Sequence, residues 1–146
     1  MGVVYDMLEA ARILSMVRTI AVVGASRNPA KDAYRVPEYL VRAGYEVIPV
    51  NPSADEILGR KAYPSLLDIP DDIASRIDVI DVFRPPEEAL TIVEQAIEMK
   101  RRYGKPHIIW FQPGTSSPEA LESAVREGFT VVRGLCIKVV HATMTR

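Results

Sequence analysis

The segment that decides the fold is TIAVVGASRNP, residues 19–29. Its first five residues form an apolar run, which predicts a buried strand over residues 19–23. Gly24 ends this run, and a short polar, basic loop leads to a helical pattern that begins near Tyr34. The first strand-to-helix turn of an α/β protein commonly holds a phosphate-bearing ligand. The segment therefore predicts an α/β fold with a phosphate-binding turn at Gly24.

Strand and helix patterns alternate along the rest of the chain. Apolar runs predict further strands at residues 46–50, 78–83, 107–111 and 129–132. Apolar spacing and capping residues predict helices at residues 5–17, 34–43, 87–102 and 118–127. Near-continuous apolar strands are typical of a parallel sheet that is covered on both faces. We predict a Rossmann-like, doubly wound α/β fold, with a mainly parallel five-stranded sheet and helices on both faces, in one domain of residues 1–146.

Some details carry separate expectations. Pro49 lies inside the second strand, which predicts an edge-like or locally unpaired position. Pro37 fits the first turn of the helix that begins near Tyr34. Residues 53–76 are expected to be irregular, and residues 137–140 are expected to form a last short strand or a turn.

The composition argues against several functional classes. The net charge of −1 provides no overall positive field for nucleic acid or an anionic membrane. The single cysteine, Cys136, cannot form an internal disulfide and fits a reducing compartment. No apolar run approaches ~18 residues, and the first residues lack the basic region of a signal peptide. We therefore expect a cytoplasmic protein that binds neither nucleic acid nor membranes.

Five loops follow the carboxyl ends of the expected strands, where ligands bind in such folds. They are residues 24–28, 51–53, 83–86, 112–114 and 134–136. Gly24 permits a sharp turn close to a phosphate. The N–H groups of Ala25 and Ser26, together with the Ser26 hydroxyl, are candidate donors to its oxygens.

Basic residues near this turn could neutralise a phosphate. Arg27, Lys31 and Arg35 follow the turn in sequence, and Arg60 would join them, with Lys61, if its loop folds back. The alternative is that Gly24 only ends a strand and that the basic side chains form a solvated surface.

The turn departs from a dinucleotide site in two respects. An NAD site expects G-x-G-x-x-G here and an acidic residue at the end of the second strand, which binds ribose hydroxyls. This loop has one glycine, and Asn51-Pro52 stands where the acid is expected. Both departures favour a phosphate-bearing ligand other than NAD.

Several stretches, taken together and in order, resemble a known family. They are VVGAS at 22–26, YEVIPVNP at 45–52, Gly59 with YPSL at 63–66, DVIDVFR at 78–84, IWFQ at 109–112, and TVV at 130–132 leading to Cys136. The chain resembles the small stand-alone CoA-binding proteins, which are similar to the N-terminal domain of the succinyl-CoA synthetase alpha subunit. The resemblance extends from about Leu14 to His141.

The resemblance implies coenzyme A or an acyl-CoA as the ligand. It implies that the diphosphate lies on residues 24–26, with Lys31 as a phosphate partner, and that residues 51–52 border the ribose phosphate and adenine. Residues 83–85 and 112–114 would then line the path of the pantetheine arm. The predicted binding residues are Gly24, Ala25, Ser26, Arg27, Lys31, Arg35, Asn51, Pro52, Arg60, Phe83, Arg84, Pro85, Gln112 and Gly114.

No catalytic residue can be nominated from the sequence. His107 and His141 lie outside the predicted ligand loops, and no Ser-His-Asp or paired-carboxylate arrangement is present. One cysteine and two scattered histidines lack the spacing of metal ligands. Asp81, on the strand at 78–83, is expected to have satisfied hydrogen bonds.

Cys136 ends the last predicted ligand loop and has two interpretations. It is either a buried, apolar-like cysteine or a thiol close enough to the CoA sulfur to form a mixed disulfide.

We predict a CoA-binding protein without its own catalytic machinery. The alternatives are a nucleotide-dependent enzyme, a CoA ligase or transferase component with a separate subunit, and a regulatory protein. Tyr5, Met7 and Met16 are either part of the core or the surface of a homo-oligomer, and the sequence does not decide between these roles.

Overall fold

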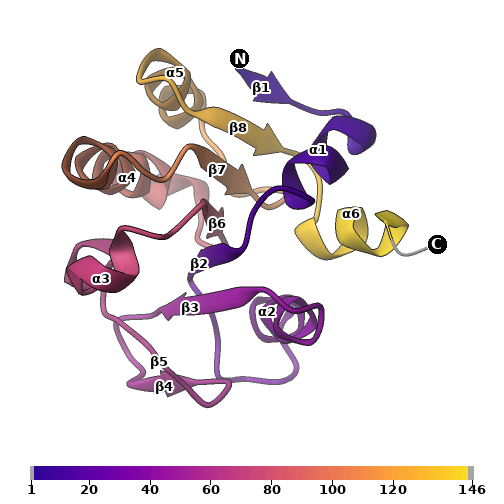
Figure 1. The fold of residues 1–146 in the computed structure, drawn as a ribbon, viewed down its shortest axis with the longest axis vertical. Coiled ribbons are helices and arrows are strands. Elements are labelled where there is room, and N and C mark those ends of the chain that lie inside the picture. The colour runs from indigo at the N-terminus through magenta and orange to yellow at the C-terminus, as the bar shows by residue number, and fades with distance from the viewer. Residues whose placement is uncertain (1, 145–146) are drawn as a thin grey trace.

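A parallel sheet forms the centre of the molecule, as the computed structural model of residues 2–144 shows (Figure 1). The strand order is β1-β8-β7-β6-β2-β3, and every neighbouring pair is parallel. The strands are β1 Val3–Val4, β2 Thr19–Val23, β3 Glu46–Val50, β6 Val79–Val82, β7 Ile108–Phe111 and β8 Thr130–Arg133. The chain turns from β2 to β3 on one side and later to β6 on the other, so the strand order reverses beside β2.

Helices cover both faces of this sheet, so the predicted Rossmann-like fold is confirmed. The helices are α1 Met7–Leu14, α2 Asp32–Arg42, α3 Asp71–Ala74, α4 Ala89–Tyr103, α5 Pro118–Arg126 and α6 Ile137–Met144. Apolar residues of α3, α4 and α5 form one half of the core, and those of α1, α2 and α6 form the other half. Among residues 2–144, no helix combines the length and the apolar character that a membrane span requires.

The sheet has one strand more than predicted. β1 pairs with β8 through Val3 opposite Val131 and Val4 opposite Val132. A strand of two residues is too short to show a periodic pattern, which is why the sequence did not reveal it. The predicted helix at 5–17 begins after this strand, where the Asp6 side chain accepts from Leu8 N at 2.9 Å and caps α1.

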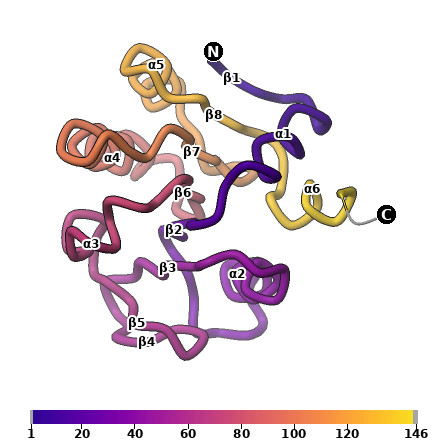
Figure 2. Tube along the Cα trace, in the orientation of Figure 1, coloured from indigo at the N-terminus to yellow at the C-terminus, as the bar shows by residue number. Residues whose placement is uncertain are grey.

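Two other predictions are wrong. Residues 137–140 belong to the helix α6, in which Ile137 and Val140, three positions apart, are both buried. Residues 53–76, expected to be irregular, contain an antiparallel hairpin of β4 Glu56–Ile57 and β5 Arg60–Lys61, followed by α3 (Figure 2). Short 3-10 turns also form at Leu66–Asp68 and at Pro86–Glu88, before α4.

Pro49 occupies an edge strand, as predicted. β3 pairs within the sheet with β2 alone, and Pro49 lies opposite Val22. On its outer side, the Pro49 carbonyl accepts from Tyr63 N at 3.1 Å, and Asn51 N donates to the Tyr63 carbonyl at 2.9 Å. Proline has no N–H to donate to a neighbouring strand. It is tolerated in β3 because β3 lies at the edge of the sheet, where no second strand needs that N–H.

Candidate functional site

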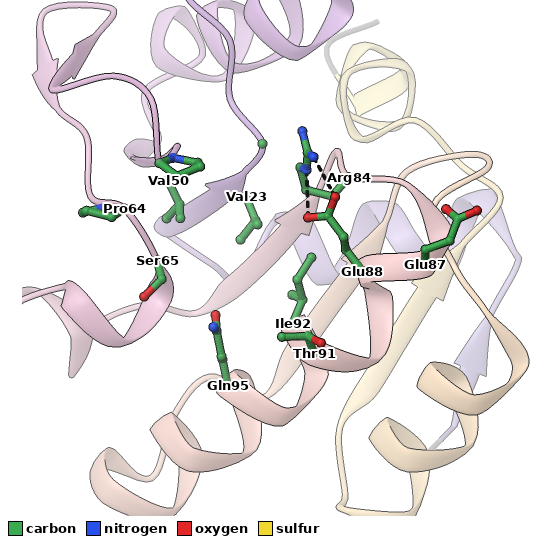
Figure 3. A pocket seen from close by; sticks show the side chains of 12 residues that line it. Val23, Val50, Pro64, Ser65, Arg84, Glu87, Glu88, Thr91, Ile92 and Gln95 are labelled. Carbon is green, nitrogen blue, oxygen red and sulfur yellow. Dashed lines mark hydrogen bonds and ion pairs between the residues drawn. The ribbon is translucent and has the colours of Figure 1, made fainter.

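A cavity of about 250 Å³ opens at the carboxyl ends of β2 and β3, beside the point where the strand order reverses. Its apolar lining comes from Val23, Val50, Pro52, Pro64 and Ile92, and its polar lining comes from Ser65, Arg84, Glu87, Glu88, Thr91 and Gln95, with Gly24 at its edge. Ser65 and Gln95 project into the same space from opposite sides (Figure 3). Ligands bind at such reversal points in open α/β sheets.

Gly24 allows the first turn to approach the end of β6. Its φ of +93° lies in the left-handed region, where a side chain is strained. A Cβ built at this position would lie 2.9 Å from the Phe83 carbonyl oxygen and 2.7 Å from Arg84 Cδ. Gly24 N also donates to the Val50 carbonyl at 2.9 Å, which joins the ends of β2 and β3. No other residue type fits here without movement of the neighbouring backbone.

Pro37 determines how the loop after Gly24 is held. The prediction of Pro37 in the first turn is wrong, because α2 begins at Asp32 and Pro37 is its sixth residue. Proline has no N–H, so the Ala33 carbonyl, four residues earlier, lacks its usual helical donor. Ser26 N donates to this carbonyl instead, at 3.0 Å.

The Ser26 groups that were expected to bind phosphate therefore have partners inside the loop. Ser26 N is bound as described, and the Ser26 hydroxyl accepts from Asn28 N at 3.0 Å. The N–H groups of Ala25 and Arg27, in contrast, have no acceptor within residues 2–144. Ala25 is fully buried, so of the two only Arg27, which is exposed, presents a free backbone N–H to an anion.

The basic residues near the turn differ in how far they are already paired. Arg27 and Lys31 are exposed and have no ion-pair partner among the described residues. Arg35 pairs with Asp32 at 2.8 Å and also donates to the Ala30 carbonyl at 2.8 Å. Arg27 and Lys31 therefore offer a ligand positive charge that no carboxylate among the described residues neutralises.

Arg84 lies at the edge of the cavity and forms a two-point ion pair with Glu88 (Figure 3). The two nitrogen-to-oxygen distances are 3.1 and 2.6 Å. This hydrogen-bonded pairing lowers the pKa of Glu88 and raises that of Arg84. Phe83, before it, is half-buried, and Pro85, after it, is exposed.

Asn51 connects the second loop to the first. Its Nδ2 donates to the Ala25 carbonyl at 2.8 Å, and its Oδ1 accepts from Ser53 N at 2.7 Å. An ionised aspartate has no N–H to offer the Ala25 carbonyl. This contact gives a structural reason for an amide at the position where a dinucleotide site has an acid. Pro52 follows and lines the cavity.

Gln112 supports the last loop. Its side chain is buried, and its Oε1 accepts from Ile137 N at 3.1 Å at the start of α6. The indole N–H of Trp110 donates to the Leu135 carbonyl at 2.8 Å in the same loop. Cys136, which is half-buried, is therefore held between two anchored neighbours. Gly114 is exposed in the turn after β7, at a φ of +79°.

Arg60 lies away from the other predicted residues, which corrects its assignment to this edge. Tyr63 pairs in parallel with Val50, at the carboxyl end of β3. Arg60, three residues earlier in the chain, therefore lies toward the amino end of the sheet. There it borders a different cavity, together with Arg18 and Arg76.

Of the predicted binding residues, Gly24, Pro52 and Arg84 line the cavity. Sequence reasoning missed Ser65, Thr91 and Gln95, although Pro64-Ser65 was part of the family resemblance. Thr91 and Gln95 lie four positions apart in α4, and only the packing of α4 reveals which of its faces meets the cavity.

Asp81 contradicts the expectation of satisfied hydrogen bonds. It lies between Val22 of β2 and Trp110 of β7 and is fully buried. Neither of its carboxyl oxygens has a hydrogen-bond partner among residues 2–144. Burial raises the pKa of Asp81 well above its ordinary value, which favours the protonated, neutral form of the side chain. Among the described residues there is no group of three or more His, Cys, Asp or Glu side chains suited to a metal ion.

Comparisons with known proteins agree with this geometry. A family profile described as a CoA binding domain matches residues 18–142. The structure of a hypothetical protein from Pyrococcus horikoshii OT3 has a TM-score of 0.86 and 39% identity, covering 97% of this chain and 93% of that chain. The uncharacterized protein YneT of Bacillus subtilis is 39% identical over 134 residues, which are 92% of this chain and 93% of YneT.

A larger enzyme shares part of the chain. The ADP-forming acetate–CoA ligase II of Archaeoglobus fulgidus is 36% identical over 89 residues. These residues make up 60% of this chain but only 13% of the ligase. The chain therefore corresponds to a small part of that enzyme.

Proposed function

The chain belongs to the family of CoA-binding domains, and on that premise we propose that it is a cytoplasmic protein that binds coenzyme A or an acyl-CoA at the carboxyl edge of its sheet. The observation that carries the proposal is the cavity beside Gly24, at the reversal of strand order. Its mixed lining of apolar walls and a few polar groups is typical of small-molecule sites.

The cavity takes one end of the ligand, and the rest lies along the sheet edge. A volume of about 250 Å³ is below the ~300–1,000 Å³ of typical ligand pockets. The apolar surfaces of Val50, Pro52 and Ile92 suit the adenine ring, and Ser65 and Gln95 offer hydrogen bonds to its polar edge.

The phosphates bind on the first turn. Arg27 N supplies a free donor, and the exposed side chains of Arg27 and Lys31 supply positive charge. Lys31 directly precedes α2, whose N-terminal end favours an anion. Residues 83–85 and 112–114 then border the pantetheine arm.

The thiol end of the ligand lies on the side of Cys136. There, the Cys136 thiolate attacks one sulfur of CoA disulfide, a mixed disulfide forms, and one CoA leaves as the thiolate. Intact-mass measurement after incubation with CoA disulfide tests this step. We expect a reducible CoA adduct on the wild type and none on Cys136→Ser; an undiminished adduct on the variant contradicts the step.

We propose a binding module without catalytic machinery of its own. Among residues 2–144 there is no group of three or more His, Cys, Asp or Glu suited to a metal ion, and the Glu88 carboxylate at the cavity is already paired with Arg84. Native mass spectrometry of the freshly purified protein tests the proposal. We expect a bound mass equal to CoA or an acyl-CoA; a protein that stays unliganded after CoA is added contradicts it.

The second candidate is a ligase component that acts with a separate subunit. It is supported by the similarity to an acetate–CoA ligase, of which the matched residues make up 13%. Affinity purification from the native organism distinguishes the two. A stoichiometric, co-purifying ligase-type subunit supports the ligase component, and its absence supports the binding module.

A further inference from the structure

A second cavity, of about 690 Å³, lies at the amino edge of the sheet, away from Gly24. It opens where β2 and β3 begin and beside the residues that precede β6 and β7. The charged side chains around it are Arg18, Glu46, Arg60, Arg76, Asp78 and Lys105. Four cations against two carboxylates leave an excess of two positive charges in a chain whose net charge is −1.

The two carboxylates already have a full set of donors. Glu46 accepts from Arg76 Nε at 2.9 Å, from Arg76 Nη2 at 2.5 Å and from the Thr19 hydroxyl at 2.8 Å. The Arg76 hydrogen bonds lower the pKa of Glu46 to about 2, so it stays ionised. Asp78 accepts from Lys105 Nζ at 2.6 Å and from the backbone N–H groups of Arg18 and Thr19 at 2.9 and 3.0 Å.

Two guanidinium groups make no hydrogen-bonded ion pair with a carboxylate, although the charge of Arg18 acts on Glu46 through space. The side chain of Arg18 makes no ion pair or hydrogen bond within the described part of the chain. Arg60 makes one side-chain hydrogen bond, from Nη1 to the Leu58 carbonyl at 3.0 Å, and no ion pair there. The ion pairs Glu46–Arg76 and Asp78–Lys105 connect the strand ends without Arg18 or Arg60, so these two cations are not needed for that structural role.

We propose that the amino-edge cavity is an anion site that binds the phosphate group of a small phosphorylated molecule. A phosphate monoester carries close to two negative charges at neutral pH, which match the two unpaired guanidiniums. Planar guanidinium forks bind phosphate oxygens in pairs. Arg76 and Lys105 are held in place by Glu46 and Asp78 and add positive potential at the rim. The site is independent of CoA binding, because it lies at the other edge of the sheet.

Titration of the 15N-labelled protein with inorganic phosphate at low ionic strength tests the proposal. We expect saturable shifts of the Arg18, Thr19 and Gly44 amides, distinct from any shift at Gly24 and Ala25. The double variant Arg18→Ala/Arg60→Ala should bind phosphate at least tenfold more weakly at this edge. Succinate, a dicarboxylate, should bind more weakly than phosphate.

The matched control is Arg42→Ala/Arg126→Ala, which removes the same charge from exposed ion pairs on α2 and α5. It should retain the affinity of the wild type. Amide spectra without phosphate establish that both double variants are folded. The proposal is overturned if the amino-edge amides do not shift saturably, if both double variants weaken binding equally, or if succinate binds as tightly as phosphate.

Discussion

At the scale of single residues, Gly24 combines a positive φ with close contact to a neighbouring backbone atom, which no other described glycine does. It has a positive φ, and a Cβ there would meet the Phe83 carbonyl oxygen at 2.9 Å. Gly44 has a similar φ of +101°, but nothing lies within 4 Å of a Cβ built on it. A comparison of the two positions therefore separates backbone strain from steric contact.

We predict that Gly24→Ala lowers the free energy of unfolding more than Gly44→Ala does, by at least ~1 kcal/mol. The additional loss of stability in Gly24→Ala arises because the new methyl group would contact the Phe83 carbonyl and displace the end of β6. Urea denaturation of both variants measures the difference. Equal losses would mean that the contact with residue 83 is relaxed at little cost.

Asp81 predicts an unusual pH dependence of stability. Its pKa is raised in the folded protein, so between about pH 4 and that raised value the folded state holds a proton that the unfolded state has released. The stabilisation linked to this proton is present below the unfolded pKa and is lost as the pH rises. Asp81→Asn removes the titration.

Denaturation of the wild type and of Asp81→Asn at several pH values measures this effect. We expect the wild type to lose stability relative to the variant as the pH rises above about 4, by up to ~1.4 kcal/mol per pH unit. Parallel stability curves for the two proteins would show that Asp81 does not keep its proton on folding.

At the scale of elements, α2 and the turn before it depend on each other. Pro37 leaves the Ala33 carbonyl without a helical donor, and Ser26 N takes that place at 3.0 Å. The shape of the ligand loop is thus fixed by a proline inside the following helix. This coupling could not be predicted from the sequence, because it depends on where α2 begins, and helix ends are the least certain feature of a pattern.

We predict that Pro37→Ala loosens this loop. The new N–H at position 37 competes for the Ala33 carbonyl, so the Ser26 amide should exchange its hydrogen at least several-fold faster. Hydrogen exchange followed by NMR measures the change. Pro118→Ala is the control, because Pro118 occupies the first position of α5 and frees no carbonyl. Unchanged exchange at Ser26 would contradict the coupling.

At the scale of the whole molecule, the sequence was sufficient for the layers and for the edge that carries the candidate site. Apolar runs such as 19–23 are long enough to define a parallel strand, and their carboxyl ends define one edge. The two-residue strands β1, β4 and β5 were too short to leave a pattern. Arg60 was misplaced for this reason, since the direction of its hairpin depends on the pairing of Tyr63 with Val50.

The cavity itself needed tertiary structure. Its α4 wall consists of residues whose sequence pattern fits an ordinary amphipathic helix, and its other wall comes from the segment after the hairpin. Gln112 and Asn51 were predicted to bind the ligand, and the structure shows that their hydrogen bonds to Ile137 and Ala25 hold the loops in place. Such supporting roles are visible only once the loops are brought together.

We propose that this edge binds coenzyme A and does not favour a dinucleotide, because Asn51 provides no acid for ribose hydroxyls. Titration calorimetry of the ligand-free protein with CoA and, in parallel, with NAD tests it most directly. We predict saturable binding of one CoA per chain and at least tenfold weaker binding of NAD. No saturable binding of CoA, or an equal affinity for NAD, would contradict this proposal.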